Sequence, residues 1–281
     1  MRGPVDRIRA AVAVAWWVLM GAATLPHAGA AQRPVSGAGD TVQVPEALVP
    51  TAARVADSLL ALGDMRGAYD VLSARLDVAG DDVGARLMAV QVATGLGLVG
   101  GDAATRLHWL RTADAQGAEL LRRAPDDPDA MAWAAAARGR RAMAEDGARM
   151  VVRLAQDVWA ITGDLLAVAP DHPLGNLVRG KLHYEAMRLS RPKRFFARVF
   201  LGFDLAGDAS WAGAQAHMEK ALAGDPGMIF FYLDLGDTYR AQGKLDQAEA
   251  TYRRGLARTD SLPVDGHLKG LLRRRLERLG R

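Results

Sequence analysis

The chain has 281 residues, of which 50% are hydrophobic and 24% charged, and its formal net charge at pH 7 is +4. It contains no cysteine, which excludes disulfide bonds, thiolate metal sites and attachment to a membrane through a lipid-modified cysteine. The folded protein must therefore be held together by its hydrophobic core, and the chain is long enough to build one.

The N-terminal residues predict export. Three arginines precede an apolar run over residues 10–25, which is shorter than the ~20 residues of a membrane-spanning helix. The small residues of "AGAAQ" then offer a cleavage site after Ala30 or Ala31. We predict a signal peptide over residues 1–31 and a periplasmic or extracellular location. The alternative is an N-terminal segment that stays uncleaved and anchors the protein to a membrane.

Residues 32–45 are rich in Gly, Pro and small polar residues and predict a flexible linker. Removing residues 1–31 takes away three arginines and one aspartate, which leaves a net charge of +2. This nearly neutral balance gives no reason to expect a nucleic-acid partner.

From residue 46 onward the composition favours helix, with abundant Ala, Leu and Arg and no convincing strand. Asp-Pro and Asp-x-Pro sequences are expected to supply N-caps and first-turn prolines. Helices are predicted over residues 83–98, 103–123, 129–145, 150–168 and 173–189.

The clearest repeat is a helical hairpin over residues 229–260. Gly243 ends its first helix, and small residues on both helices allow a close approach. The expected packing residues are Tyr232, Leu235, Gly236 and Tyr239 on the first helix and Ala248, Tyr252 and Leu256 on the second. This hairpin resembles a tetratricopeptide repeat, although Gly255 stands where that pattern usually has Ala.

The same pattern recurs along the chain. Gly63 precedes Ala68 by five residues, as Gly243 precedes Ala248, and "AQAHMEKALAGDP" is a second helix whose first helix, residues 173–189, is separated from it by an insertion at about 190–209. In the last segment, "PVDGHLKGLLRRRLERL", leucines form one stripe with arginines on the opposite face, which predicts a solvent-facing capping helix. Residues 46–281 therefore predict an all-α, tetratricopeptide-like α-solenoid of antiparallel helix pairs with a C-terminal capping helix.

The order of these features is similar to a narrower group. The segments "VADSLLALGDMRGAYDVL", "HPLGNLVRGKLHYE", "RFFARVFLG", "LDLGDTYRAQGKLDQAE" and "PVDGHLKGLLRRRLERL" resemble the regulator of microtubule dynamics family, over roughly residues 52–279. The resemblance implies a helical adaptor without catalytic residues. Eukaryotic members are associated with microtubules, organelle contacts and lipid binding, but an exported protein would not meet tubulin.

One glycine motif is close to a P-loop. Gly175, Gly180 and Lys181 have nearly the required spacing, but Leu182 replaces the hydroxyl residue that binds magnesium, and no strand precedes the motif. We instead expect Gly180, like Gly236, to let paired helices touch.

A second glycine motif, "GLGLVG", spells the dinucleotide-binding pattern. That pattern functions between a strand and a helix, whereas here a helix precedes it. We therefore expect Gly95, Gly97 and Gly100 to terminate that helix.

No catalytic or metal-binding pattern is present. The histidines after the predicted signal peptide are scattered, and neither H-E-x-x-H nor G-x-S-x-G occurs. We predict that the protein is not an enzyme and has no cofactor, although carboxylates clustered in a deep pocket would reopen the question.

The first helices of repeat pairs line the concave surface of a solenoid, where partners bind. By spacing, the candidate groove residues are Leu174, Leu177, Lys181, Tyr184, Phe230, Leu233, Asp237 and Arg240. The alternative is that several of them pack between repeats.

The insertion holds four of the six phenylalanines, interleaved with basic residues. One hypothesis is a lid or docking element for anionic lipid or an acidic partner, and the alternative is an amphipathic helix packed on the solenoid. The candidate docking residues are Arg191, Lys193, Arg194, Phe196, Arg198, Phe200 and Phe203.

The sequence thus predicts an exported, non-catalytic scaffold that binds a protein or peptide in its concave groove. The alternative is a lipid-binding or membrane-surface module that uses the insertion. A polar, open groove would favour the first interpretation, and an apolar tunnel beneath the insertion the second.

Overall fold

A computed structural model of the chain describes residues 49–190, 194 and 208–280, and every regular element within them is a helix. This confirms the all-α prediction. The helices are α2 (Val49–Ala61), α3 (Met65–Val78), α4 (Val83–Val99), α5 (Ala103–Arg123), α6 (Pro128–Ala144), α7 (Ala148–Val168), α8 (Pro173–Arg188), α11 (Trp211–Gly224), α12 (Ile229–Ala241), α13 (Leu245–Leu256) and α14 (Asp265–Leu279).

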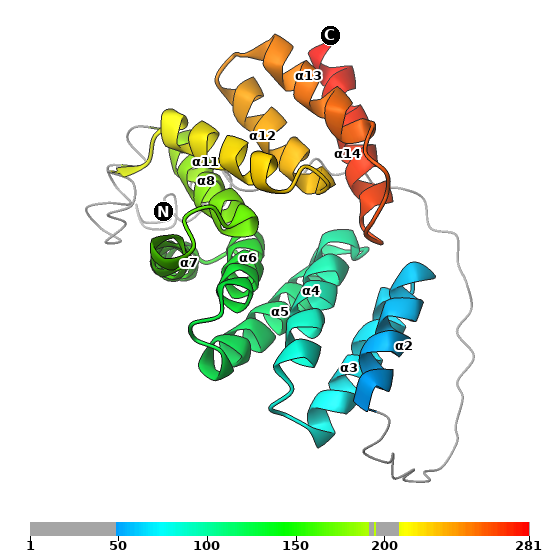
Figure 1. Cartoon of the computed structure of the whole chain (residues 1–281). Helices are drawn as coiled ribbons and strands as arrows, with labels where there is room; N and C mark the ends of the chain where they lie inside the picture. The colour runs from blue at the N-terminus through cyan, green and yellow to red at the C-terminus, as the bar shows by residue number, and fades with distance from the viewer. Residues whose placement is uncertain (1–48, 191–193, 195–207, 281) are drawn as a thin grey trace, which may run out of the picture.

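The helices form successive antiparallel pairs, α2 with α3, α4 with α5, α6 with α7, α8 with α11, and α12 with α13, and α14 packs on the last pair (Figure 1). The pairing of α8 with α11 is the one predicted across the insertion. Because each pair turns the chain back, α4, α6, α8 and α12 run in the same direction, and neighbours among them touch. These first helices therefore form one continuous inner layer of a tetratricopeptide-like solenoid.

Local caps explain most helix boundaries. Asp102, Asp127 and Ser210 each accept a backbone N–H three residues ahead, as N-cap residues do. The expected aspartate cap before Pro173 is wrong, because the capping residue is His172, whose Nδ1 accepts from the N–H of Gly175 at 3.1 Å. An imidazole nitrogen supplies the same acceptor as a carboxylate oxygen.

Two glycines mark the turns of the hairpins. Gly63 and Gly243 have φ values of +80° and +75°, in the left-handed region that glycine adopts without steric penalty. Both follow first helices, so the short turns that precede α3 and α13 have the same backbone form.

Glycines also permit close helix contacts, as predicted. A Cβ on Gly180 would lie 2.8 Å from Cγ of Met218, and one on Gly236 would overlap the Tyr252 ring. Gly255 replaces the usual alanine for the same reason, since a Cβ there would lie 2.7 Å from Cβ of Tyr232. Close packing between the helices therefore requires glycine at these three positions.

The expectation that Gly95 and Gly97 terminate a helix is wrong. Both lie inside α4, which continues to Val99, and only Gly100 caps it. A Cβ on Gly97 would lie 2.5 Å from Cδ2 of Leu110, so this glycine allows α5 to pack closely on α4. Close packing between helices therefore explains Gly95 and Gly97 better than termination of the helix.

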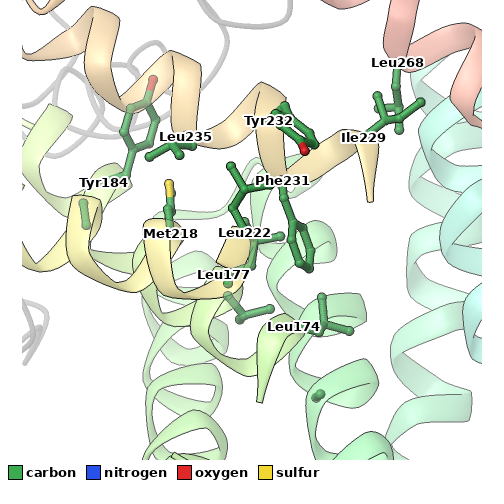
Figure 2. Close-up of a cluster of buried hydrophobic side chains, with 14 of the residues drawn as sticks. Leu174, Leu177, Tyr184, Met218, Leu222, Ile229, Phe231, Tyr232, Leu235 and Leu268 are labelled. Carbon is green, nitrogen blue, oxygen red and sulfur yellow. The ribbon is translucent and has the colours of Figure 1, made fainter. Parts of the chain in front are cut away.

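The largest part of the core lies in the seam among α8, α11 and α12 (Figure 2). Tyr184, Phe231 and Tyr232 are among the largest fully buried side chains, and Met218 lies between the helices. This seam fixes α12 beside α8 and so aligns the two helices that carry the predicted groove residues.

The two ends of the solenoid meet. A Cβ on Gly95 of α4 would lie 3.2 Å from Sδ of Met65 and 3.3 Å from Cγ1 of Val264, just before α14. The C-terminal repeats therefore curve back to the N-terminal ones, as Figure 1 shows for α14 and α4. This contact helps to enclose the concave side.

Candidate functional site

The concave side holds a cavity of about 260 Å³. It is bounded by the first helices α2, α4, α6, α8 and α12, by the start of α3, by part of α7, and by the start of α14 with the segment that leads into it. Its wall is mainly apolar and includes Leu60, Met65, Met88, Val92, Leu98, Trp133, Met143, Leu174, Leu177, Met228, Phe230, Leu262, Val264 and Leu268. A wall of this composition, with a few polar groups, is typical of a ligand site.

The charged residues of the wall gather at one end. On α8 the apolar Leu174 and Leu177 come before Lys181 and Glu185, and on α12 Phe230 comes before Asp234. On α6 Trp133 likewise comes before Arg140. On α8 and α12 the charged residues therefore follow the apolar ones along the helix, while on α6 Ala142 and Met143 also line the cavity beyond Arg140.

The ionic end is a cluster of two cations and two carboxylates. The Lys181 Nζ donates to Asp234 Oδ1 at 2.7 Å and lies 3.6 Å from Glu185 Oε1. The Arg140 guanidinium reaches Asp234 Oδ2 only at 3.7 Å. We call these four residues the ionic cluster; it joins α6, α8 and α12 across the inner layer.

Lys181 is charged in this setting. Burial alone would favour the neutral amine, but the carboxylates of Asp234 and Glu185 outweigh it, so the pKa of Lys181 is raised above its ordinary value. A lysine of this kind acts as a fixed positive charge and not as a base.

Four of the eight predicted groove residues come together at the cavity: Leu174, Leu177, Lys181 and Phe230. Leu174 and Leu177 also belong to the core seam of Figure 2, and Phe230 packs edge-on against Phe231 at 4.7 Å between ring centroids.

The other four, Tyr184, Leu233, Asp237 and Arg240, are not among the described residues that line the cavity. Tyr184 is buried with its ring edge-on to Trp211, and Leu233 packs against the core. Asp237 is buried and accepts from Arg275 at 2.7 and 3.0 Å and from the Tyr252 hydroxyl at 2.6 Å.

The Asp237 network is a structural contact between α12, α13 and α14. Burial would raise the pKa of Asp237, but the hydrogen bonds and charge of Arg275 and the Tyr252 hydroxyl lower it below its ordinary value. Arg240 lies 3.8 Å from Asp237 at the edge of this network. These side chains hold the capping helix in place.

Of the predicted docking residues in the insertion, Arg191, Lys193, Phe196, Arg198, Phe200 and Phe203 lie outside the described residues. Arg194 is described and half-buried, and its Nη1 lies 2.9 Å from Sδ of Met187 on α8.

A second polar cluster lies where α7, α8 and α11 meet. His183 Nδ1 accepts from the backbone N–H of Ser210 at 3.2 Å, and its ring stacks on His217 at 5.6 Å. Arg179 lies over the Trp159 ring. Burial first, and then repulsion from His217 and Arg179, lowers the pKa of His183 to about 4, so the ring is neutral at pH 7.

Sequence reasoning missed Arg140, Asp234 and the role of Glu185 in this site. The spacing of Lys181 and Glu185, four residues apart on one helix, was a visible sign of an ion pair. No local pattern links Arg140 or Asp234 to them, because these residues lie on other helices.

Among the residues that the structure describes, no group of three or more His, Asp or Glu side chains could hold a metal ion. The described helices also include none with the length and apolar character needed to cross a membrane.

The family model for "Regulator of microtubule dynamics protein 1-3" matches residues 53–277, nearly the whole described solenoid. The chain belongs to this family. The match confirms the resemblance seen in the sequence and includes every helix that bounds the cavity. A comparison with curated proteins gave no match.

A solved structure confirms the fold of this family member. The thermophilic tetratricopeptide-repeat protein TTC0263 of Thermus thermophilus is 19% identical, with a TM-score of 0.56 over 81% of this chain and 98% of that chain. The MamA protein is 15% identical, with a TM-score of 0.41 over 74% of this chain and 89% of that chain. At these identities, the first likeness establishes the tetratricopeptide-like solenoid, and we draw nothing from the second.

Proposed function

We propose that this protein is a non-catalytic, exported binding protein that holds an apolar ligand, such as the acyl chain of a lipid, in its concave cavity. The observation that carries the proposal is the wall of the cavity, which is apolar over most of its length and ionic at one end. Burial of an alkyl chain against such a wall is favourable by roughly 25 cal/mol per Å².

The polar groups of the wall argue for an alkyl chain over an extended peptide. Each residue of a peptide brings one N–H and one C=O, which need partners when they leave water. Thr94 already donates to the carbonyl of Val90, and Lys181 to Asp234. Free polar groups remain at the ionic end, on Arg140 and Glu185, but along the apolar part of the wall a peptide backbone would find few partners, whereas an alkyl chain needs none.

A protein-interaction scaffold is the second candidate function. It is supported by the tetratricopeptide-like fold and by the family to which the chain belongs. In this case the partner would place apolar side chains in the cavity and leave its backbone at the open edge.

Two glycines allow a matched experiment. Gly139 of α6 lines the cavity, and a Cβ there would meet no atom within 4 Å. Gly163 of α7 has the same free space but does not line the cavity. We therefore expect Gly139→Phe to fill the cavity without a clash and Gly163→Phe to leave it open.

The purified wild-type protein and both variants would be extracted with organic solvent and analysed by mass spectrometry, and then titrated with a fluorescent alkyl probe. We expect bound lipid and probe binding in the wild type and in Gly163→Phe, and at least about a tenfold loss in Gly139→Phe. Equal binding by both variants would contradict this site. A partner protein lost from Gly139→Phe, without any bound lipid in the wild type, would favour the scaffold.

Export is proposed from the N-terminal pattern of residues 1–31. Intact mass of the protein recovered outside the cytoplasm tests it, because cleavage after Ala30 or Ala31 fixes the mass of the product. A full-length mass would support the anchored alternative.

A further inference from the structure

The ionic cluster has unused hydrogen-bonding capacity. Its one short contact joins Lys181 to Asp234 at 2.7 Å, while the contacts of Glu185 and Arg140, at 3.6 and 3.7 Å, are too long for hydrogen bonds. Among the described residues, neither the Arg140 guanidinium nor the Glu185 carboxylate has a hydrogen-bond partner closer than these. Both side chains line the cavity, so their free groups are available to a ligand.

The charge balance of the cluster restricts the head group that it can accept. Two cations and two carboxylates cancel, and all four side chains are at least three-quarters buried. A purely anionic head group would add a third negative charge beside Asp234 and Glu185, and a purely cationic one a third positive charge beside Lys181 and Arg140. Either repulsion is strong where water is scarce. A head group with one charge of each sign avoids both.

The position of the cluster also fixes the direction of the ligand. The charged residues lie together where α6, α8 and α12 meet, and from there the apolar wall runs along α8 and α12 toward Leu174 and Phe230. A ligand with a polar end and an apolar end therefore fits in one orientation.

We propose that the ligand is an amphiphile with a zwitterionic head group, whose anionic part pairs with Arg140 and whose cationic part pairs with Glu185, while its alkyl chain lies along the apolar wall. This inference rests on the proposed function, since it names the class of apolar ligand that the same cavity takes. The remaining pair, Lys181 and Asp234, stays intact and holds the wall together.

A series of dodecyl probes that differ only in the head group tests the proposal. Dodecylphosphocholine is zwitterionic, dodecyl phosphate anionic, dodecyltrimethylammonium cationic and dodecanol neutral, and each would compete with a fluorescent alkyl probe below its micelle concentration. We expect the wild type to bind dodecylphosphocholine about tenfold more tightly than each of the others, because only that head group places an anion beside Arg140 and a cation beside Glu185 without adding net charge to the cluster.

Arg140→Gln and Glu185→Gln should each remove this preference and leave the affinity for dodecanol unchanged. The control is Arg149→Gln, which removes a charge from an exposed residue outside the cavity and should keep the preference. Circular dichroism would show that all three variants remain folded. Equal affinity for the four head groups, or a preference that survives both substitutions, would overturn this inference alone. Failure of the wild type to bind any dodecyl probe would overturn it together with the proposed lipid ligand.

Discussion

Lys181 donates to Asp234 at 2.7 Å across 53 positions of sequence, and this ion pair joins α8 to α12 in the wall of the cavity. The pair is the shortest contact of the ionic cluster. It therefore contributes to the stability of the inner layer as well as to the shape of the cavity.

Replacing this lysine tests the structural part of that role. Lys181→Met should lower the free energy of unfolding by about 2 kcal/mol, because Asp234 would stay buried with Arg140 only at 3.7 Å. Urea unfolding followed by circular dichroism measures the change. In the double variant Lys181→Met with Asp234→Leu, the loss should be smaller than in the single variant. A single variant as stable as the wild type would contradict the pair's contribution.

Gly236 should tolerate no side chain. A Cβ at this position would overlap the Tyr252 ring, so Gly236→Ala should cost about 2–3 kcal/mol of stability. Gly163→Ala is the matched control, because it also lies inside a helix but has free space, and it should gain up to about 1 kcal/mol from helix propensity. Thermal unfolding of both variants compares the two effects. Equal shifts in Tm would show that the close contact of Gly236 with the Tyr252 ring does not determine stability.

Acid should weaken the junction of α7, α8 and α11. The pKa of His183 in the folded protein is about 4, below its ordinary value of 6.5, so the unfolded chain takes up the proton first. The neutral ring therefore contributes stability above pH 6.5 that is lost as the pH falls toward 4, on the order of 2 kcal/mol. Arg179 and His217 oppose protonation, while Asp208 favours it.

The measurement is the free energy of unfolding in urea at pH 7 and at pH 4.5. His183→Gln should show a smaller decrease between the two values than the wild type, since glutamine does not titrate. His108→Gln, at an exposed histidine, should match the wild type. If His183→Gln loses as much unfolding free energy between pH 7 and pH 4.5 as the wild type, the acid sensitivity belongs to other groups.

The docking role of the insertion remains a prediction from the sequence. If it is a docking element, deleting residues 191–206 should lower binding to vesicles that contain anionic lipid and leave the helical solenoid folded. Vesicle flotation at low and high salt measures the binding, and circular dichroism checks the fold. Undiminished binding by the deletion would leave packing on the solenoid as the role of this segment.

The candidate site could be predicted only in part. Spacing on α8 and α12 selected Leu174, Lys181 and Phe230, which line the cavity, because one helical face repeats every three to four residues. The same spacing also selected Tyr184 and Asp237, which are buried in contacts with other helices. A helix has more than one packed face in a solenoid, and periodicity alone does not tell the cavity from the seam between repeats.

Local chemistry in the sequence determined the helices and their pairing. Aspartate and serine caps, left-handed glycines at Gly63 and Gly243 and small residues at Gly180 and Gly236 act over a few residues, so they can be read without a structure. Only the tertiary structure decided how the pairs curve. That curvature brings Val264 to Gly95 and Arg140 to Asp234, and it encloses an apolar cavity with an ionic end, because contacts between distant helices depend on the packing of every repeat between them.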